Sequence, residues 1–265
     1  MVITGLTRNQ VARKGSWVRI PPSPPCFPSL VQRGECCIKN IRGVYMLSEE
    51  TKQLLKRYFN AAANLYGMIR LYKLLEIYNS QNEPISEEDF LAFADEIDSE
   101  KEHFDLVSDE EVFEDVFETK PLSRWLAAEY LYALGDFDDF EKIFENTIGI
   151  TYYVPNKKKF LKYEDEFYFE KTPEYIELRA FIRSMPDLSK ERADSIAEEI
   201  EANLSLDLCE DEDENIEYAI ANAMRLGLNV DGQERELYRL VFEFDKNLRK
   251  HVYAGHTHKE VLMMF

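Results

Sequence analysis

Three histidines near the carboxyl end of the chain are the residues best suited to chemistry. His251, His256 and His258 lie within eight residues of one another. A His-x-His pair with a third imidazole can bind Zn²⁺ or another transition metal, which predicts a metal-binding protein or a metal-dependent hydrolase. The alternative is structural: His251 ends a helix, where the helix dipole favours a cation, and the other two lie in the following turn. Zinc sites normally have fuller ligand sets, which favours the structural interpretation.

The other candidates for chemistry are weaker. The acidic run from Glu210 to Glu214 lacks the glycine and the ligand spacing of a calcium loop. Cys209, beside it, is the only cysteine after residue 45, and a single cysteine is commonly a small core residue. The chain has no glycine-rich nucleotide loop, no Gly-x-Ser-x-Gly and no His-Glu-x-x-His motif. We therefore assign no catalytic residue and no cofactor, with zinc at the histidines as the alternative, and favour a protein that is not an enzyme.

Charge is distributed unevenly along the chain. The formal net charge is -19, from 32 basic and 51 acidic residues. Residues 1–45 hold seven of the basic residues and one acid, so residues 46–265 hold 25 basic and 50 acidic residues. A surface this acidic repels phosphates, so direct nucleic-acid binding is not expected. No window of about eighteen apolar residues occurs, so no membrane association is expected either.

The first 45 residues also differ in composition. They hold five of the ten prolines and three of the four cysteines and show no apolar period. The segment RNQVARKGSWVRIPPSPP resembles the conceptual translation of a transfer-RNA gene, because Val18–Pro21 back-translates to the T-arm consensus and Ser23–Pro25 to a sequence ending in CCA. Arg42–Met46 back-translates to a ribosome-binding sequence followed by ATG. We therefore expect residues 1–45 to be a disordered or non-native extension and the natural chain to start at Met46.

Apolar residues recur at helical spacing through most of the remaining chain. The pattern predicts a mainly α fold, an irregular multi-helix bundle with a few short β segments. We expect an N-terminal helical domain with short strands (46–170) and a C-terminal helical domain (171–265). The spacing further predicts a break near Gly67, a helix from Trp125 to Gly135 and a strand at 150–154.

Residues 68–107 follow the order helix, turn, helix, strand, which is that of a degenerate winged helix. In helix-turn-helix proteins the second helix enters the major groove of DNA. Here that helix would carry carboxylates at Glu87, Glu88, Asp89, Asp95, Glu96 and Asp98. Because these charges would face phosphates, we expect this part of the chain to bind protein or simply to pack.

Three segments resemble a family of bacterial proteins associated with the SEC-C motif. They are Tyr58–Tyr78, Tyr152–Phe169 and Asn247–Val261. The resemblance implies no established activity. Family members often end in a cysteine-rich zinc-binding tail, and this zinc site does not carry over because the chain has no cysteine after Cys209. The Gly255-His256-Thr257 turn matches the place of Gly-His-Thr-Pro in relatives, which makes His256 as much a structural residue as a functional one.

Together these observations favour an acidic, cytoplasmic helical protein that acts as a protein–protein interaction or regulatory module. A lone body cysteine suits a reducing compartment. One alternative is a nucleic-acid mimic, whose carboxylates imitate phosphates and occupy a DNA-binding protein. The other alternative is the metal-dependent protein that uses His251, His256 and His258.

The interpretation of residues 1–45 predicts the amino terminus of the natural protein. N-terminal sequencing of material purified from its own host is expected to read from Met46. A mature chain that contains Trp17 would refute this start site.

Overall fold

The computed structural model describes residues 47–97, 102–113, 120–131, 138–206 and 212–265. Within these ranges the fold is mainly α-helical with one small sheet, as predicted. No helix in the same ranges combines the length and the apolar character needed to cross a membrane. The predicted extension 1–45, the start at Met46, Cys209 and Gly135 lie outside the described residues.

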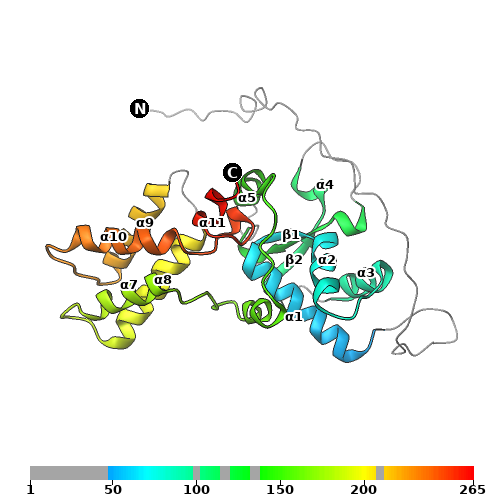
Figure 1. The fold of residues 1–265 in the computed structure, drawn as a ribbon, viewed down its shortest axis with the longest axis horizontal. Coiled ribbons are helices and arrows are strands. Elements are labelled where there is room, and N and C mark those ends of the chain that lie inside the picture. Colours follow the sequence, from blue (N-terminus) through cyan, green and yellow to red (C-terminus); the bar gives the residue numbers. More distant parts are fainter. Residues whose placement is uncertain (1–46, 98–101, 114–119, 132–137, 207–211) are drawn as a thin grey trace, which may run out of the picture. The chain divides into compact units, whose positions relative to one another are not determined.

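The N-terminal part of the fold alternates helices with three short strands (Figure 1). Its elements are α1 (Glu49–Tyr66), β1 (Met68–Arg70), α2 (Leu71–Gln81), α3 (Glu87–Glu96), β2 (Phe104–Val107), α4 (Asp109–Val112), η3 (Pro121–Ser123), β3 (Trp125–Ala128) and η4 (Glu129–Leu131). The sheet is antiparallel, with the strand order β1-β3-β2. The order of the three helices and three strands, with β3 between β1 and β2 in the sheet, matches the connectivity of a winged helix.

Capping residues set the starts of the helices in this part. The Ser48 hydroxyl accepts a hydrogen bond from the amide of Thr51, and the Ser86 hydroxyl accepts one from the amide of Asp89. These bonds satisfy amides that have no partner inside the helix. Helix α1 ends at Gly67, whose φ of +69° is left-handed, so the predicted break is confirmed.

Two sequence predictions are wrong in this region. Residues 125–128 form strand β3, where a helix was expected, because all four side chains are buried and the backbone pairs with both β1 and β2. Pairing on both sides outweighs a weak local preference for helix. Residues 150–154 form no strand; the Tyr153 amide instead donates to the carbonyl of Ala254, far along the chain.

Aromatic residues dominate the N-terminal core. The ring of Phe59 on α1 packs against those of Phe90, Phe93 and Phe104, at centroid distances of 5.4, 5.4 and 5.8 Å. Two further segments contribute to this core: α6 (Lys157–Phe160) and η5 (Leu161–Glu164), the second of which packs along α1. Helix α5 (Asp138–Thr147) instead buries Phe140 and Ile143 in a separate cluster with Met68 and Trp125.

A second apolar core lies among four helices (Figure 1). They are α7 (Pro173–Arg183), α8 (Lys190–Leu206), α9 (Glu212–Arg225) and α10 (Glu234–Asp245). Helix α8 packs against α7 and α9, and α10 packs against the same two helices. The buried side chains of this core fall between Phe169 and Leu248. The domain boundary at 170/171 stays a prediction.

After α10 the chain returns to the N-terminal core. Residues 249–262, which we call the C-terminal hook, contain η6 (His251–Tyr253) and α11 (His258–Leu262). Val252 of the hook is buried in one apolar cluster with Met68 and Phe140. At Gly255 a Cβ atom would lie 2.9 Å from the ring of Tyr66, so glycine is needed for this close approach. The hook and the end of α1 are therefore fitted to one another.

A buried ion pair lies where α10 leads into the hook. Lys250 Nζ is 2.7 Å from an Asp245 carboxylate oxygen, and both side chains are almost fully shielded from solvent. Removing two charges from water is costly, and their mutual attraction compensates for that cost only while both are present.

Removing one partner of this pair is therefore expected to destabilise the protein strongly. For Lys250→Met we expect the free energy of unfolding to fall by about 3–5 kcal/mol, because the Asp245 carboxylate stays buried without its counter-ion. The double variant Asp245→Leu/Lys250→Met should recover most of that loss. Urea unfolding followed by circular dichroism measures both values. Equal losses in the single and double variants would contradict this account.

Candidate functional site

The structure gives each of the three candidate histidines a different hydrogen-bond partner. His251 Nε2 donates to the carbonyl of Asn64 at 3.0 Å, and its Nδ1 accepts from the hydroxyl of Tyr130. Burial lowers the pKa of His251, and this outweighs the bond to Asn64, which acts in the opposite direction. The ring is therefore kept neutral, as its two bonds require.

His256 and His258 face other groups. His256 is buried; its Nε2 donates to the carbonyl of Thr151 at 2.8 Å, and its Nδ1 is 3.2 Å from a carboxylate oxygen of Glu260. His258 Nδ1 is 3.4 Å from the hydroxyl of Tyr253. In the part of the chain that the structure describes, no three His, Cys, Asp or Glu residues are arranged to hold a metal ion.

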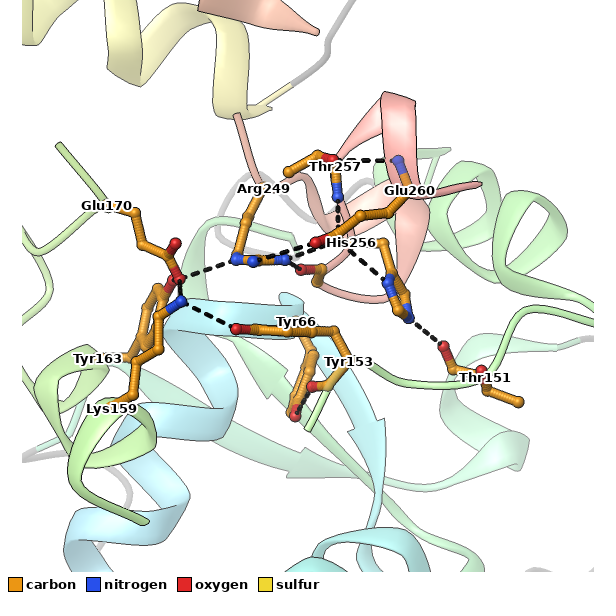
Figure 2. Close-up of polar contacts among 11 residues, drawn as sticks. Tyr66, Thr151, Tyr153, Lys159, Tyr163, Glu170, Arg249, His256, Thr257 and Glu260 are labelled. Carbon is orange, nitrogen blue, oxygen red and sulfur yellow. Dashed lines mark hydrogen bonds and ion pairs between the residues drawn. The ribbon is translucent and has the colours of Figure 1, made fainter. Parts of the chain in front are cut away.

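Arg249 is the centre of the polar network that fixes the hook (Figure 2). Its Nε donates to Glu170 at 2.8 Å, and its Nη1 donates to Glu260 at 2.9 Å and to the carbonyl of Gly255 at 3.1 Å. The guanidinium carbon also lies 3.5 Å from the ring centroid of Tyr153. A planar guanidinium can make these in-plane bonds and stack on an aromatic face at the same time, which lysine cannot do.

Glu170 joins this network to the segment before α7. Besides Arg249, it accepts hydrogen bonds from Lys159 Nζ at 2.8 Å and from the Tyr163 hydroxyl at 2.9 Å (Figure 2). Burial raises the pKa of Glu170, but its bonds to Lys159 and Arg249 outweigh burial and hold the pKa below its usual value. Burial also raises the pKa of Glu260, but the bond from Arg249 lowers it, and the net result is a lowered pKa.

The groups of this network use their hydrogen-bonding capacity on one another. Both nitrogens of His256 are engaged, and Glu260 is shared by Arg249, His256 and the amide of Thr257. A catalytic base needs a lone pair directed at a substrate. The arrangement around Arg249 is therefore suited to holding the hook against 151–170 rather than to catalysis.

A cavity of about 500 Å³ lies beside this network. Its wall comes from the end of α1, from η4, from 163–170, from α8 and from 247–251. Five carboxylates line it, at Glu129, Glu166, Glu170, Glu198 and Glu201. We call it the acidic cavity. Of its five acids, Glu170 is neutralised by Arg249 and Lys159.

Glu201 on α8 is the acid of the cavity most affected by its surroundings. Burial raises its pKa to about 8, the neighbouring carboxylate of Glu198 adds to the rise, and Lys171 only partly opposes it. Glu198 is exposed and lies 3.8 Å from Lys171 Nζ. At neutral pH the carboxyl of Glu201 is consequently mostly protonated, which is unusual for an acid that lines a cavity.

Aromatic rings complete the wall. Phe167 lines the cavity and is nonetheless 82% exposed, so it stands at the rim. Tyr130, whose ring stacks on His251, lines the same wall. Carboxylates beside aromatic faces favour a cationic ligand, because both attract positive charge.

The cavity was not foreseen from the sequence. Of the three candidate histidines, His251 lines it, while His256 and His258 do not. Glu198 and Glu201 are three residues apart on α8, but in a chain with 51 acids such a pair carries no distinguishing signal. Their role depends on which face of α8 lines the cavity, and the spacing of apolar residues in the sequence does not show where a cavity lies.

Comparisons with known proteins give no relative for this chain: no protein-family model, no curated protein and no solved structure matches it.

The lowered pKa values in the network predict a dependence of stability on pH. Carboxylates whose pKa is lowered by folding stabilise the protein above their unfolded pKa, and the effect is lost as the pH falls through the folded value. For Arg249→Met we expect a loss of about 2–4 kcal/mol at pH 7, shrinking toward pH 3 as Glu170 and Glu260 become protonated. Urea unfolding at pH 7, 5 and 3 measures it.

The matched control is Arg239→Met, because Arg239 also contacts two glutamates but is about half exposed. We expect that variant to lose much less stability than Arg249→Met at every pH, because solvent screens an exposed pair. A pH-independent loss in Arg249→Met would contradict the role given to the two carboxylates.

Proposed function

We propose that this protein is a cytoplasmic interaction module that binds another protein through the acidic exposed face of α3. The observation that carries the proposal is the charge of that helix. Its exposed side chains include four carboxylates and no base: Glu87, Glu88, Asp95 and Glu96.

The place of α3 in the fold makes its charge informative. It occupies the position from which a helix-turn-helix protein inserts its second helix into DNA. Duplex DNA carries one negative charge per about 1.7 Å of axis, so a carboxylate-bearing helix is strongly repelled there. Lys52 pairs with Glu96 and Arg124 with Asp95, both at 2.6 Å, so these cations compensate two of the four carboxylates. Among the contacts of the described residues, Glu87 and Glu88 have no such counter-ion and carry the repulsion.

The chemistry of the partner follows from the same charge. An acidic helix face with a net charge of -19 behind it attracts a basic protein surface and speeds its encounter. Glu110 and Glu111, at the start of α4, are exposed and add negative charge to this part of the chain, whereas Asp109 is paired with Arg70 at 2.7 Å. A location in the reducing cytoplasm is part of the proposal and is supported by the single cysteine after residue 45.

The two alternative functions differ in how they relate to this proposal. A nucleic-acid mimic would use the same face of α3, and its partner would be a DNA-binding protein, so it is a special case of this proposal. We do not propose a metal-dependent hydrolase, because His251, His256 and His258 each have a separate hydrogen-bond partner. The resemblance to SEC-C-associated proteins stays a prediction and supplies no activity.

Charge reversal on α3 tests the proposal. Glu87 and Glu88 make no ion pair among the contacts of the described residues. The double substitution Glu87→Lys/Glu88→Lys therefore reverses surface charge without breaking an ion pair. We expect wild type to show no salt-dependent binding to duplex DNA by fluorescence anisotropy. We expect the charge-reversed variant to lose about tenfold or more in affinity for a purified partner.

The control makes the same change of net charge elsewhere. Glu191→Lys/Glu217→Lys reverses two exposed acids on α8 and α9 and should keep partner affinity within about twofold of wild type. Steeply salt-dependent DNA binding by wild type, or equal losses in both double variants, would overturn the proposal.

A further inference from the structure

We propose that the acidic cavity binds an alkylammonium group, carried either by a small aliphatic diamine or by a lysine side chain of a protein partner. The site is distinct from the acidic face of α3, and only the lysine source rests on the proposed function.

The volume of the cavity suits a small ligand. Its roughly 500 Å³ lies within the range of about 300–1,000 Å³ typical of small-molecule sites. An aliphatic ammonium chain is narrow and needs little apolar surface. The site is therefore large enough for a short diamine or for one lysine side chain entering from the rim.

The balance of charge in the wall is negative. Arg249 is matched by Glu170 and Glu260, so it contributes no excess positive charge. Of the other acids, Glu129 and Glu198 add negative charge, and Glu201 is largely protonated at neutral pH. Within the described residues, Lys171 is a nearby base, 3.8 Å from Glu198. Glu166 faces His103 at 3.3 Å, which compensates it only when that ring is protonated. A cationic ligand would neutralise this excess.

Glu201 has the environment expected of the principal ligand-binding carboxyl. It is partly buried, lines the cavity and makes no ion pair or hydrogen bond among the contacts of the described residues. An acid that is buried without a partner is destabilised in its charged form. An ammonium group placed against it restores the charge and supplies the missing hydrogen bonds.

The aromatic wall selects organic cations over bare metal ions. The rings of Phe167 and Tyr130 line the cavity together with the carboxylates. Aromatic faces attract ammonium groups and also contact the methylene chain that carries them. Small hard cations prefer oxygen ligands alone and gain nothing from such rings.

Proton release gives the proposal a specific signature. With its pKa raised to about 8, the carboxyl of Glu201 is largely protonated at pH 7, and an ammonium group that pairs with it must displace that proton. Binding should therefore release close to one proton and strengthen as the pH rises from 6.5 to 8.5. The other titratable or charged groups around the cavity are His103, Glu129, Tyr130, Tyr163, Glu166, Glu170, Lys171, Glu198, Arg249 and His251.

The test is isothermal titration calorimetry on the full chain at pH 7 in two buffers of different ionisation enthalpy. The charged probes are 1,4-diaminobutane and Nα-acetyl-lysine amide, whose side-chain amine is free, and both carry ammonium groups at this pH. The uncharged probe is 1,4-butanediol. We expect wild type to bind at least one of the amines with release of nearly one proton, and not to bind the diol. Binding of the diamine alone identifies a free diamine as the source, and binding of the lysine amide identifies a protein side chain.

Matched variants separate this site from general attraction to an acidic protein. Glu201→Gln keeps the shape of the side chain and should weaken amine binding about tenfold or more and abolish proton release. Phe167→Ala, at the exposed rim, should weaken binding by a few fold and keep proton release. Glu191→Gln removes an exposed acid from the same helix and should change neither quantity, and His103→Gln should keep proton release.

Three outcomes would overturn the inference: no amine binding by wild type, equal binding by wild type and Glu201→Gln, or proton release that survives in Glu201→Gln. Circular dichroism confirms that each variant is folded. The result is independent of the proposed function, because Glu87→Lys/Glu88→Lys should still bind the amine with proton release even if no protein partner of α3 exists.

Discussion

The interactions of Arg249 are the constraint on which the rest of the structure depends. Its side chain is 11% exposed and still makes charged hydrogen bonds to Glu170 and Glu260, each of a kind that contributes about 1.5–3 kcal/mol. Glu170 precedes α7 and Glu260 belongs to α11, so one guanidinium ties the start of the helical bundle to the end of the hook. The adjacent residue, Lys250, forms the buried pair with Asp245. Two consecutive cations thus fix the path of the chain as it leaves α10.

The network around Arg249 and the acidic cavity lie beside each other and differ in how their carboxylates are compensated. Around Arg249 the carboxylates have counter-ions, and their pKa values are lowered by bonds that outweigh burial. Glu201 is partly buried beside a second acid and has little positive charge nearby, so its pKa rises to about 8. The first arrangement stabilises the fold and leaves little capacity for a ligand. In the second, the carboxyl of Glu201 is largely protonated at neutral pH, and the proposed ammonium ligand would favour its charged form.

The sequence predicted those parts of the fold that depend on local signals. The break at Gly67 and the helical character of the C-terminal part are set by neighbouring residues, and the structure confirms them. Strand β3 was predicted as a helix because its burial comes from β1 and β2, which are distant in the sequence. The acidic cavity was missed for the same reason, since its wall joins residues from 63 to 251. The arrangement of the histidines likewise depends on Asn64, Tyr130 and Thr151, none of which is a sequence neighbour.

The return of the hook to the first core has a consequence for synthesis on the ribosome. Val252 completes an apolar cluster with Met68 and Phe140, and Gly255 fits against Tyr66. The intervening residues 169–248 can bury their own core as soon as they emerge. The cluster around Met68 and Phe140, by contrast, stays incomplete until the later-made Val252 leaves the exit tunnel, at about 5–20 residues per second. The small cluster around Met68 and Phe140 is therefore completed after the core of residues 169–248, although Met68 and Phe140 are made before that core.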